Sequence, residues 1–222
     1  MTVIHNIDLA LDFDEFTEYA GQALRHENVQ KVAAWAVSEA QQWAEPAIAY
    51  NWLPVEVLDR RRVKVGAAVL TIGGHADLMA PALQACASVF TIGPQLEEEA
   101  RRLMAAGRNL EAYLLGEAGV LAVGTLGRRV QRIVEEEAAG RGWGVGAELA
   151  PGQLAGWKIE EQKLVCSLVE VDAIGVRVNE SGMLVPQKSA SALVGIGPEY
   201  TATKVCSPCD FCDKQDTCSW RH

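Results

Sequence analysis

Residues 88–106 read Ser-Val-Phe-Thr-Ile-Gly-Pro-Gln-Leu-Glu-Glu-Glu-Ala-Arg-Arg-Leu-Met-Ala-Ala, and this stretch decides the fold class. Its first five residues are mostly apolar or β-branched, which is typical of a buried strand, and Gly93-Pro94 ends that strand. Proline suits the first turn of a helix. Acidic and basic residues then follow at helical spacing, in the pairs Glu97–Arg101 and Glu98–Arg102. The stretch therefore predicts a strand over 88–92 that passes directly into a helix over 95–106 with a charged, solvated face.

Two further strands are predicted, and they end in the same way. Residues 63–72 alternate at first and then become continuously apolar, and residues 190–196 are small and apolar. All three predicted strands end on Ile-Gly. We interpret this ending as shared turn chemistry at three strand exits. The alternative is that the glycines allow a ligand to approach the backbone at one edge of the sheet.

Helices are predicted both before and after the strand over 88–92 in the sequence. Apolar residues recur at three- and four-residue spacing over 14–24, 29–43 and 109–139. The last of these helices contains Gly116, Gly119, Gly124 and Gly127. Each glycine costs a helix interior roughly 1 kcal/mol relative to alanine. We expect close helix–sheet packing to compensate, with a break in the helix or a flat ligand as the alternatives. Strands and helices together predict an α+β fold.

The composition favours a folded protein of the cytoplasm. The chain has 222 residues, 49% hydrophobic and 22% charged, which suffices for a sizeable core. No stretch approaches eighteen uninterrupted apolar residues, so no membrane span is predicted. The formal net charge of −9 argues against nucleic-acid binding, which requires a basic surface. The first sixteen residues lack the basic and apolar regions of a secretory leader.

Four of the six cysteines lie in the last seventeen residues, in the spacing C-x2-C-x2-C-x5-C, at Cys206, Cys209, Cys212 and Cys218. A tail this short buries little apolar surface, so we expect it to fold around an inorganic centre. Three cysteines at successive x2 intervals suit three corners of a [4Fe–4S] cluster, and Cys218 is the candidate for the fourth.

Other chemistries of the tail remain open. A tetrahedral zinc ion is the main alternative, although zinc sites usually combine two separate C-x2-C turns. Disulfides and a redox-active C-x-x-C motif are further alternatives. His222 could replace one thiolate in a metal site. The remaining cysteines, Cys86 and Cys166, have apolar neighbours and are predicted to be buried core thiols.

The segment after Trp143 carries a family resemblance. It contains Ala-Pro-Gly at 150–152, Ile-Glu-Glu-Gln at 159–162, Asn-Glu-Ser-Gly-Met at 179–183 and Pro-Gln-Lys-Ser-Ala-Ser at 186–191. This order resembles the second half of the activation domain of cobalamin-dependent methionine synthase. Thr-Ile-Gly-Pro-Gln-Leu-Glu at 91–97, with the long helix after it, is similar to the first half of the stand-alone relatives of that domain. The resemblance covers roughly residues 60–200.

The resemblance implies a C-shaped α+β domain with a twisted, mainly antiparallel sheet and helices packed on it. It also implies binding of S-adenosylmethionine near a cobalamin domain, in support of the reductive methylation of cob(II)alamin. The positions that it marks as cofactor-binding are Glu148, Ala150, Pro151, Gly152, Gln153, Glu180, Met183, Lys188 and Ser189.

This chain departs from the family pattern at two of these positions. The family has arginine two residues before Ala-Pro-Gly and tyrosine directly after it, where this chain has Glu148 and Gln153. A guanidinium grips a carboxylate with two parallel hydrogen bonds, whereas a second carboxylate repels it. Glu148 therefore cannot anchor the methionyl carboxylate as the arginine does.

The sequence thus predicts a stand-alone reactivation or accessory factor. Its partner would be a corrinoid protein or a methionine synthase core, and its cluster would relay an electron from a donor protein. The competing interpretation is a non-enzymatic docking module whose tail is a structural zinc or cluster knot; a metal- or redox-sensing subunit is a third. The predicted organisation is a helical segment over 1–50, the α+β domain over 51–200 and the cysteine tail over 201–222.

Overall fold

The computed structural model describes residues 1–20 and 26–207. Its central feature is a seven-stranded sheet in the order β4-β3-β2-β5-β9-β6, with β1 also paired to β2. Every ladder in this sheet is antiparallel. Its strands are β1 (Thr2–His5), β2 (Ala47–Val57), β3 (Arg62–Val65), β4 (Ala68–Thr71), β5 (Gln84–Thr91), β6 (Gly144–Leu149) and β9 (Ser189–Gly197). The expected α+β class with a mainly antiparallel sheet is confirmed.

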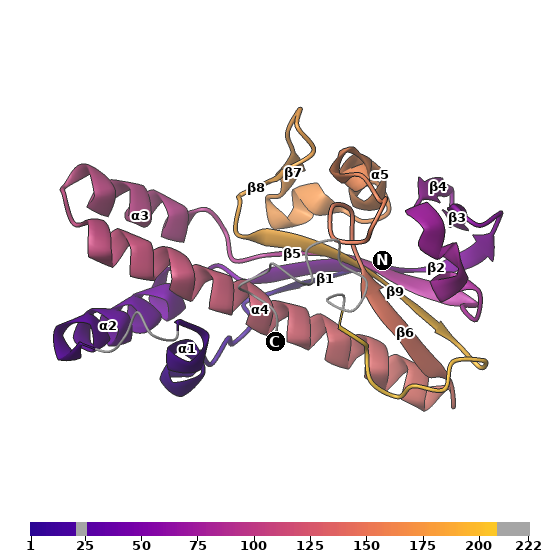
Figure 1. Cartoon of the computed structure of the whole chain (residues 1–222), viewed down its shortest axis with the longest axis horizontal. Helices are drawn as coiled ribbons and strands as arrows, with labels where there is room; N and C mark the ends of the chain where they lie inside the picture. The colour runs from indigo at the N-terminus through magenta and orange to yellow at the C-terminus, as the bar shows by residue number, and fades with distance from the viewer. Residues whose placement is uncertain (21–25, 208–222) are drawn as a thin grey trace.

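Four helices form one layer, in which the last and longest helix packs on one face of the sheet and the other three pack mainly on that helix (Figure 1). They are α1 (Phe13–Ala20), α2 (Glu27–Trp43), α3 (Gln95–Ala105) and α4 (Asn109–Gly140). Because side chains alternate along a strand, Ile48, Phe90 and Ala192 share the face that packs on these helices. By length and composition α4 could cross a membrane. Many of its residues, among them Leu114, Leu115 and Leu126, are buried in the helix–sheet core, which accounts for its apolar character.

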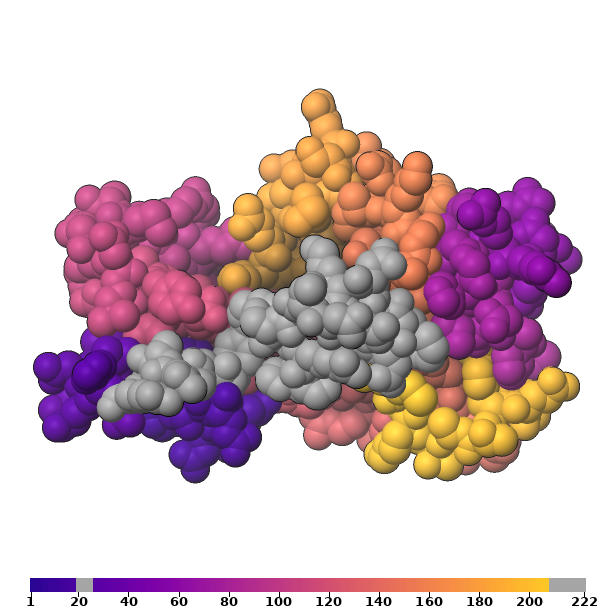
Figure 2. All heavy atoms as spheres, viewed as in Figure 1, coloured from indigo at the N-terminus to yellow at the C-terminus, as the bar shows by residue number. Residues whose placement is uncertain are grey.

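The opposite face is covered by short elements rather than long helices. They are η2 (Gly73–Met79), η3 (Ile159–Glu161), α5 (Gln162–Cys166), η4 (Val171–Ile174) and the hairpin of β7 (Arg177–Val178) and β8 (Leu184–Val185). Their core includes Trp157, Val165 and Cys166, packed on Ala49, Val89 and Leu193 of the sheet. Residues 150–188 form the central lobe in Figure 2, between α3 and the β3–β4 hairpin. The candidate site lies on this side.

Several predicted elements match the structure and one differs. The predicted strand over 88–92 overlaps β5, which ends at Thr91, and the one over 190–196 lies within β9. The helices over 95–106 and 109–139 correspond to α3 and α4. The predicted strand over 63–72 is wrong in extent, because β3 and β4 form a hairpin there that turns at Gly66, whose φ is +57°. The division at residues 50 and 200 stays a prediction; β2 spans the first boundary.

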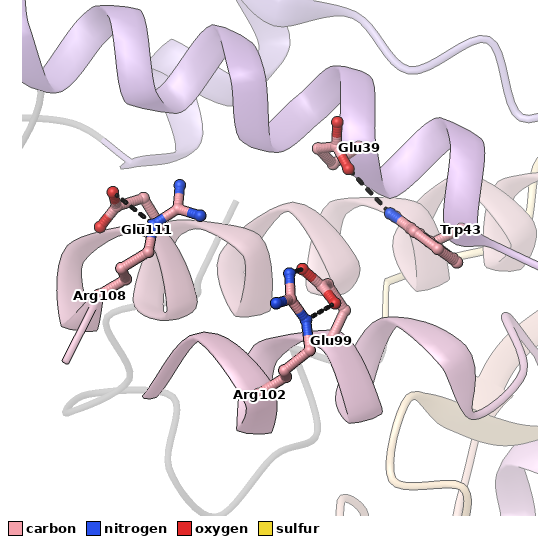
Figure 3. A network of polar contacts seen from close by, with 6 residues as sticks. All are labelled: Glu39, Trp43, Glu99, Arg102, Arg108 and Glu111. Atoms are coloured by element: carbon pink, nitrogen blue, oxygen red, sulfur yellow. Dashed lines mark hydrogen bonds and ion pairs between the residues drawn. The ribbon is translucent and has the colours of Figure 1, made fainter. Parts of the chain in front are cut away.

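The charged face of α3 is solvated as expected, but its pairs differ. Arg102 pairs with Glu99 at 2.6 Å rather than with Glu98, and Arg101 Nε donates to the backbone carbonyl of Glu97. Figure 3 shows the Glu99 pair beside two other local contacts, Glu39 with Trp43 in α2 and Arg108 with Glu111 at the start of α4. Such local pairs add little to stability, so the helices are held mainly by their apolar faces.

The three Ile-Gly endings do not meet at one edge of the sheet. Because β5 and β9 are antiparallel, Thr91 pairs with Ser189 and Gln84 with Ile196, so Gly93 and Gly197 lie at opposite ends of this ladder. A Cβ at Gly197 would lie 2.1 Å from the carbonyl oxygen of Pro81, and one at Gly73 would lie 2.5 Å from that of Ala155. The topology favours the interpretation as turn and packing glycines, and it contradicts a shared ligand edge.

The glycines of α4 divide into packed and unpacked positions. A Cβ at Gly119 would lie 2.8 Å from Leu96 Cδ2, whereas one at Gly127 would make an ordinary 3.5 Å contact with Phe90. A Cβ at Gly116 would meet nothing within 4 Å, and one at Gly124 only Arg128 Nη1, at 4.0 Å. Close packing therefore accounts for Gly119, and nothing in the described structure requires glycine at position 124.

Alanine substitutions in α4 should have opposite effects. Gly124→Ala is expected to raise the free energy of unfolding by about 0.5–1 kcal/mol, because the helix propensity of alanine is gained at no steric cost. Gly119→Ala should lower it by about 1–3 kcal/mol, because the buried Leu96 must move. Urea denaturation measures both. Equal stabilisation by the two changes would show that Gly119 is not needed for packing.

Candidate functional site

A small pocket lies between the Ala-Pro-Gly turn, the residues around Met183 and the start of β9. Its volume is about 170 Å³, below the roughly 300–1,000 Å³ of sites that enclose a drug-sized ligand. The lining residues are Ala150, Pro151, Gln153, Ile159, Gln162, Gly182, Met183, Leu184, Gln187, Ser189, Ala190 and Ser191. Of the predicted cofactor positions, Ala150, Pro151, Gln153, Met183 and Ser189 are thus brought together from three separate segments.

The Ala-Pro-Gly turn is fixed by backbone hydrogen bonds. The Gly152 N–H donates to Trp157 O at 2.8 Å, and the N–H groups of Gln153 and Leu154 both donate to Ala150 O. Gly152 has a φ of +80°, which favours glycine. Gly152 itself lines the adjoining shallow groove with Trp157 and Lys158 rather than the pocket.

The opposite wall is a turn at 179–183 that packs on η3. The Asn179 side-chain Oδ1 accepts hydrogen bonds from the N–H groups of Ser181 and Met183, at 3.0 and 2.9 Å. Gly182 has a φ of +82°, and a Cβ there would lie 2.7 Å from Ile159 O. Only glycine permits this approach, so the turn closes the pocket without filling it.

The third wall is an open strand edge. The pairing of β6 with β9 ends at Leu149 and Leu193, so over 189–192 the described structure pairs β9 with β5 alone. The Ser189 hydroxyl donates to Thr91 Oγ1 at 2.8 Å, which holds that side chain toward β5. An unpaired strand edge offers backbone N–H and C=O groups to a ligand.

Besides Gly152, three predicted positions lie outside the pocket. Glu148 faces α4, where its Oε2 accepts a hydrogen bond from Gln131 at 2.8 Å. The Lys188 side chain runs past Gly119 of α4, and its backbone N–H donates to Glu97. Glu180 is exposed. No lysine or arginine lines the pocket within the described residues, so nothing there neutralises a ligand carboxylate.

Replacing Glu148 by glutamine is expected to stabilise the fold at neutral pH, on the order of 1 kcal/mol. Burial raises the pKa of the Glu148 carboxyl, and the hydrogen bond from Gln131 offsets this only in part. The folded state then binds the proton more tightly than the unfolded state, so stability falls as rising pH ionises Glu148. Glutamine stays neutral and can still accept from Gln131. The gain should therefore vanish below about pH 4. Denaturant unfolding across pH tests this, and a gain independent of pH would contradict it.

The cysteine tail is attached to the domain at its first cysteine. Cys206 is exposed and forms a parallel bridge with Ala147 of β6, in which its carbonyl accepts the Glu148 N–H at 3.1 Å. Glu135 of α4 accepts from the Val205 N–H at 3.0 Å and from Lys204 Nζ at 2.7 Å. One candidate ligand is thus held beside β6 and α4.

The other candidate ligands, Cys209, Cys212 and Cys218, lie outside the described residues, as does His222. Within residues 1–20 and 26–207 no group of three or more His, Cys, Asp or Glu side chains could hold a metal ion. Cys86 and Cys166 are buried as predicted, and burial raises the pKa of the Cys86 thiol to about 12.

Two residues of the site were not predicted from the sequence. Trp157 is 2% exposed, and its carbonyl accepts the hydrogen bond from the Gly152 N–H of the Ala-Pro-Gly turn. Gln162 is 3% exposed and lines the pocket. A large aromatic residue directly after Gly156 was a usable signal for an anchoring side chain. Gln162 lies in a charged run and carried no signal of burial.

Of the comparisons with known proteins, the one with solved structures supports the fold. No family model matches the sequence, and no curated protein matches it. A solved structure of the MetH reactivation domain bound to AdoHcy is similar, with a TM-score of 0.66 and 15% sequence identity. The match covers 91% of this chain and 80% of that chain. The resemblance predicted from the sequence is confirmed at the level of the fold.

Proposed function

We propose that the protein is a reactivation or accessory factor for a corrinoid protein, and that it binds S-adenosylmethionine at the pocket beside the Ala-Pro-Gly turn. The observation that carries the proposal is the convergence of three segments, around Ala150, Met183 and Ser189, in a chain with the reactivation-domain fold. The solved relative was crystallised with AdoHcy, the product of methyl donation.

The pocket suits one end of this ligand better than the whole. Pro151, Ile159 and Met183 supply apolar surface for a flat ring, and the open edge of β9 supplies backbone hydrogen-bonding groups. At about 170 Å³ the pocket can take the adenine, while the amino-acid end extends into the adjoining groove. When bound, S-adenosylmethionine supplies the methyl group; the residues here hold and orient it.

A titration tests ligand binding. Isothermal titration of the full chain with S-adenosylmethionine and with S-adenosylhomocysteine should give saturable binding of both. Gly182→Val should abolish it, because the branched side chain would collide with the backbone of Ile159 at a positive φ. The matched control is Gly175→Ala, a positive-φ glycine where a Cβ meets nothing within 4 Å. Absence of binding at millimolar ligand would refute the proposal.

A specific observation favours a second function, a docking module without cofactor. Glu148 replaces the arginine of the family and is turned toward Gln131, and no described cation lines the pocket. If no ligand binds, the fold would serve only to present a surface to a corrinoid partner. The same titration separates the two functions.

A corrinoid partner is tested by its redox state. A cobalamin-binding protein should bind this chain more tightly in the Co(II) state than in the methylated state. A reactivation factor must distinguish the two states, because a protein that binds both equally shifts nothing. Equal affinities, measured by biolayer interferometry under anaerobic conditions, would count against the reactivation role.

The tail extends this proposal to electron supply. A [4Fe–4S] cluster on Cys206, Cys209, Cys212 and Cys218 would pass one electron from a donor protein to the bound corrinoid. The reduction potentials of [4Fe–4S] clusters extend low enough to reduce electron acceptors of low potential. The bridge between Cys206 and Ala147 holds the first candidate ligand beside β6, which supports a cluster close to the domain. The alternative is that the same cysteines bind a zinc ion with a structural role.

A further inference from the structure

We infer that Gln162 is the residue that selects the adenine base in the pocket, by accepting a hydrogen bond from its exocyclic amino group. The inference rests on the proposed function and adds a specificity-determining contact to it. It concerns a side chain outside the Ala-Pro-Gly turn and outside the nine positions that the resemblance marks as cofactor-binding.

Gln162 is a polar side chain in an apolar place. It is 3% exposed, on the first turn of α5, and it lines the pocket with Ile159 and Leu184. Its Nε2 donates to Cys166 Sγ at 3.6 Å, and its Oε1 has no hydrogen-bond partner within the described residues. An unsatisfied buried polar atom costs about 1–3 kcal/mol. A donor from the occupant of the pocket would remove that cost.

Cys166 fixes which end of the amide is available. Gln162 and Cys166 are four residues apart on α5, and hence on one face of the helix. Cys166 is buried, and burial raises the pKa of its thiol, so the sulfur is held as a neutral, weak acceptor for the Nε2 group. With the nitrogen directed to the sulfur, the amide oxygen remains for the ligand.

The chemistry of the pocket identifies the group that it receives. The lining holds no carboxylate, so a charged ammonium group would lie there without a counter-ion. The adenine amino group is a neutral N–H donor, so it needs no counter-ion and can donate to the Gln162 oxygen. It is carried on a flat ring that suits the apolar walls of the pocket. A hypoxanthine ring has the same shape but carries a carbonyl oxygen at that position, which would face the Gln162 oxygen.

The test is a double-mutant cycle in which the ligand is one of the partners. Wild type and Gln162→Leu are titrated calorimetrically with S-adenosylhomocysteine and S-inosylhomocysteine. Wild type should prefer the adenosyl ligand by about tenfold to a hundredfold, the equivalent of 1–3 kcal/mol. Gln162→Leu should lose most of that preference, mainly by weaker binding of the adenosyl ligand. An undiminished preference in Gln162→Leu would overturn the inference.

Two controls keep the result interpretable. Gln41→Leu removes an exposed glutamine of α2 that does not line the pocket, and it should leave the preference intact. Thermal unfolding of Gln162→Leu should show an unchanged or higher melting temperature, because leucine buries no polar group. Wild type that binds neither ligand would refute the proposed function, and the inference with it. Binding that is indifferent to Gln162 would refute the inference alone.

Discussion

Replacing Trp157 by alanine is expected to lower the free energy of unfolding by about 3–5 kcal/mol, the usual cost of removing a large buried aromatic ring. The ring is 2% exposed and packs in the core between the sheet and the 150–188 lobe. Its Nε1 donates to Glu161 Oε2 at 3.1 Å, and the same oxygen accepts the Thr71 N–H of β4 at 2.7 Å. The substitution therefore leaves a cavity and weakens a link between two segments.

The pocket should be lost together with this stability. The Trp157 carbonyl accepts the Gly152 N–H, so a shift of residue 157 displaces the Ala-Pro-Gly turn. At temperatures where the Trp157→Ala variant is still folded, it should bind S-adenosylhomocysteine more weakly than wild type. Denaturant unfolding, followed by calorimetric titration of the folded protein, measures both effects.

Trp43 provides a matched control. Its indole Nε1 also donates to a glutamate four residues away, Glu39, at 2.8 Å, but the ring is only half-buried (Figure 3). Trp43→Ala should cost less than Trp157→Ala and should leave ligand binding unchanged. Trp157→Phe, which keeps an aromatic ring, should cost about 1 kcal/mol for the lost hydrogen bond, plus a smaller cavity term. Equal losses in the two alanine variants would contradict the anchoring role of Trp157.

The parts of the fold that could be predicted are those with an uninterrupted pattern. The core strands β5 and β9 and the helices α3 and α4 follow from apolar periodicity and from glycine or proline at their ends. The strand β2 was missed because it contains Pro54, a residue depleted in strands. In the structure Pro54 lies where the outer edge of β2 changes partner, after Tyr50 pairs with β1 and before Val55 pairs with β3. Its carbonyl accepts the Gly66 N–H at 2.9 Å on this outer edge, so its missing N–H also lies there and takes no bond from the β2–β5 ladder.

The strand β6 was missed for a different reason. Gly144 and Gly146 made its sequence look like a loop, but both are packing glycines: a Cβ would lie 2.2 Å from the Tyr200 carbonyl oxygen at Gly144 and 2.9 Å from the Tyr200 ring at Gly146. A contact between residues so far apart in the chain leaves no local pattern. The sequence could not reveal it.

The candidate site, like the fold, could be predicted only in part from the sequence. Short motifs could predict that residues around 150, 183 and 189 belong together, and the structure places them around one pocket. They could not predict side-chain direction at Glu148, which depends on the register of the missed strand β6. Leu149 faces the 150–188 lobe, so Glu148 must face α4. The burial of Gln162 likewise depends on how α5 packs on the sheet.

Protein purified without oxygen is expected to contain iron and inorganic sulfide, roughly four of each per chain, with the broad visible absorption of a [4Fe–4S] centre. Serine at Cys206, Cys209 or Cys212 should abolish the cluster, because each removes a thiolate from the three-cysteine run. Cys86→Ser is the matched control, since this buried thiol lies among apolar residues of the sheet and α4 and should leave the iron content unchanged. Stoichiometric zinc without iron or sulfide would eliminate the electron-relay function.

The contact between Glu135 and the segment before Cys206 leads to a separate prediction about how long the cluster is retained. Glu135 binds the Val205 N–H next to the first cysteine, so Glu135→Ala should release this end of the tail without removing a ligand. We expect the variant to assemble the cluster with an unchanged spectrum but to lose it several-fold faster to a chelator, because an ordered ligand segment favours metal retention. Glu136→Ala, an exposed neighbour on α4, should behave as wild type. If Glu135→Ala retains the cluster as long as wild type, the contact between Glu135 and the Val205 N–H does not help to hold the metal site.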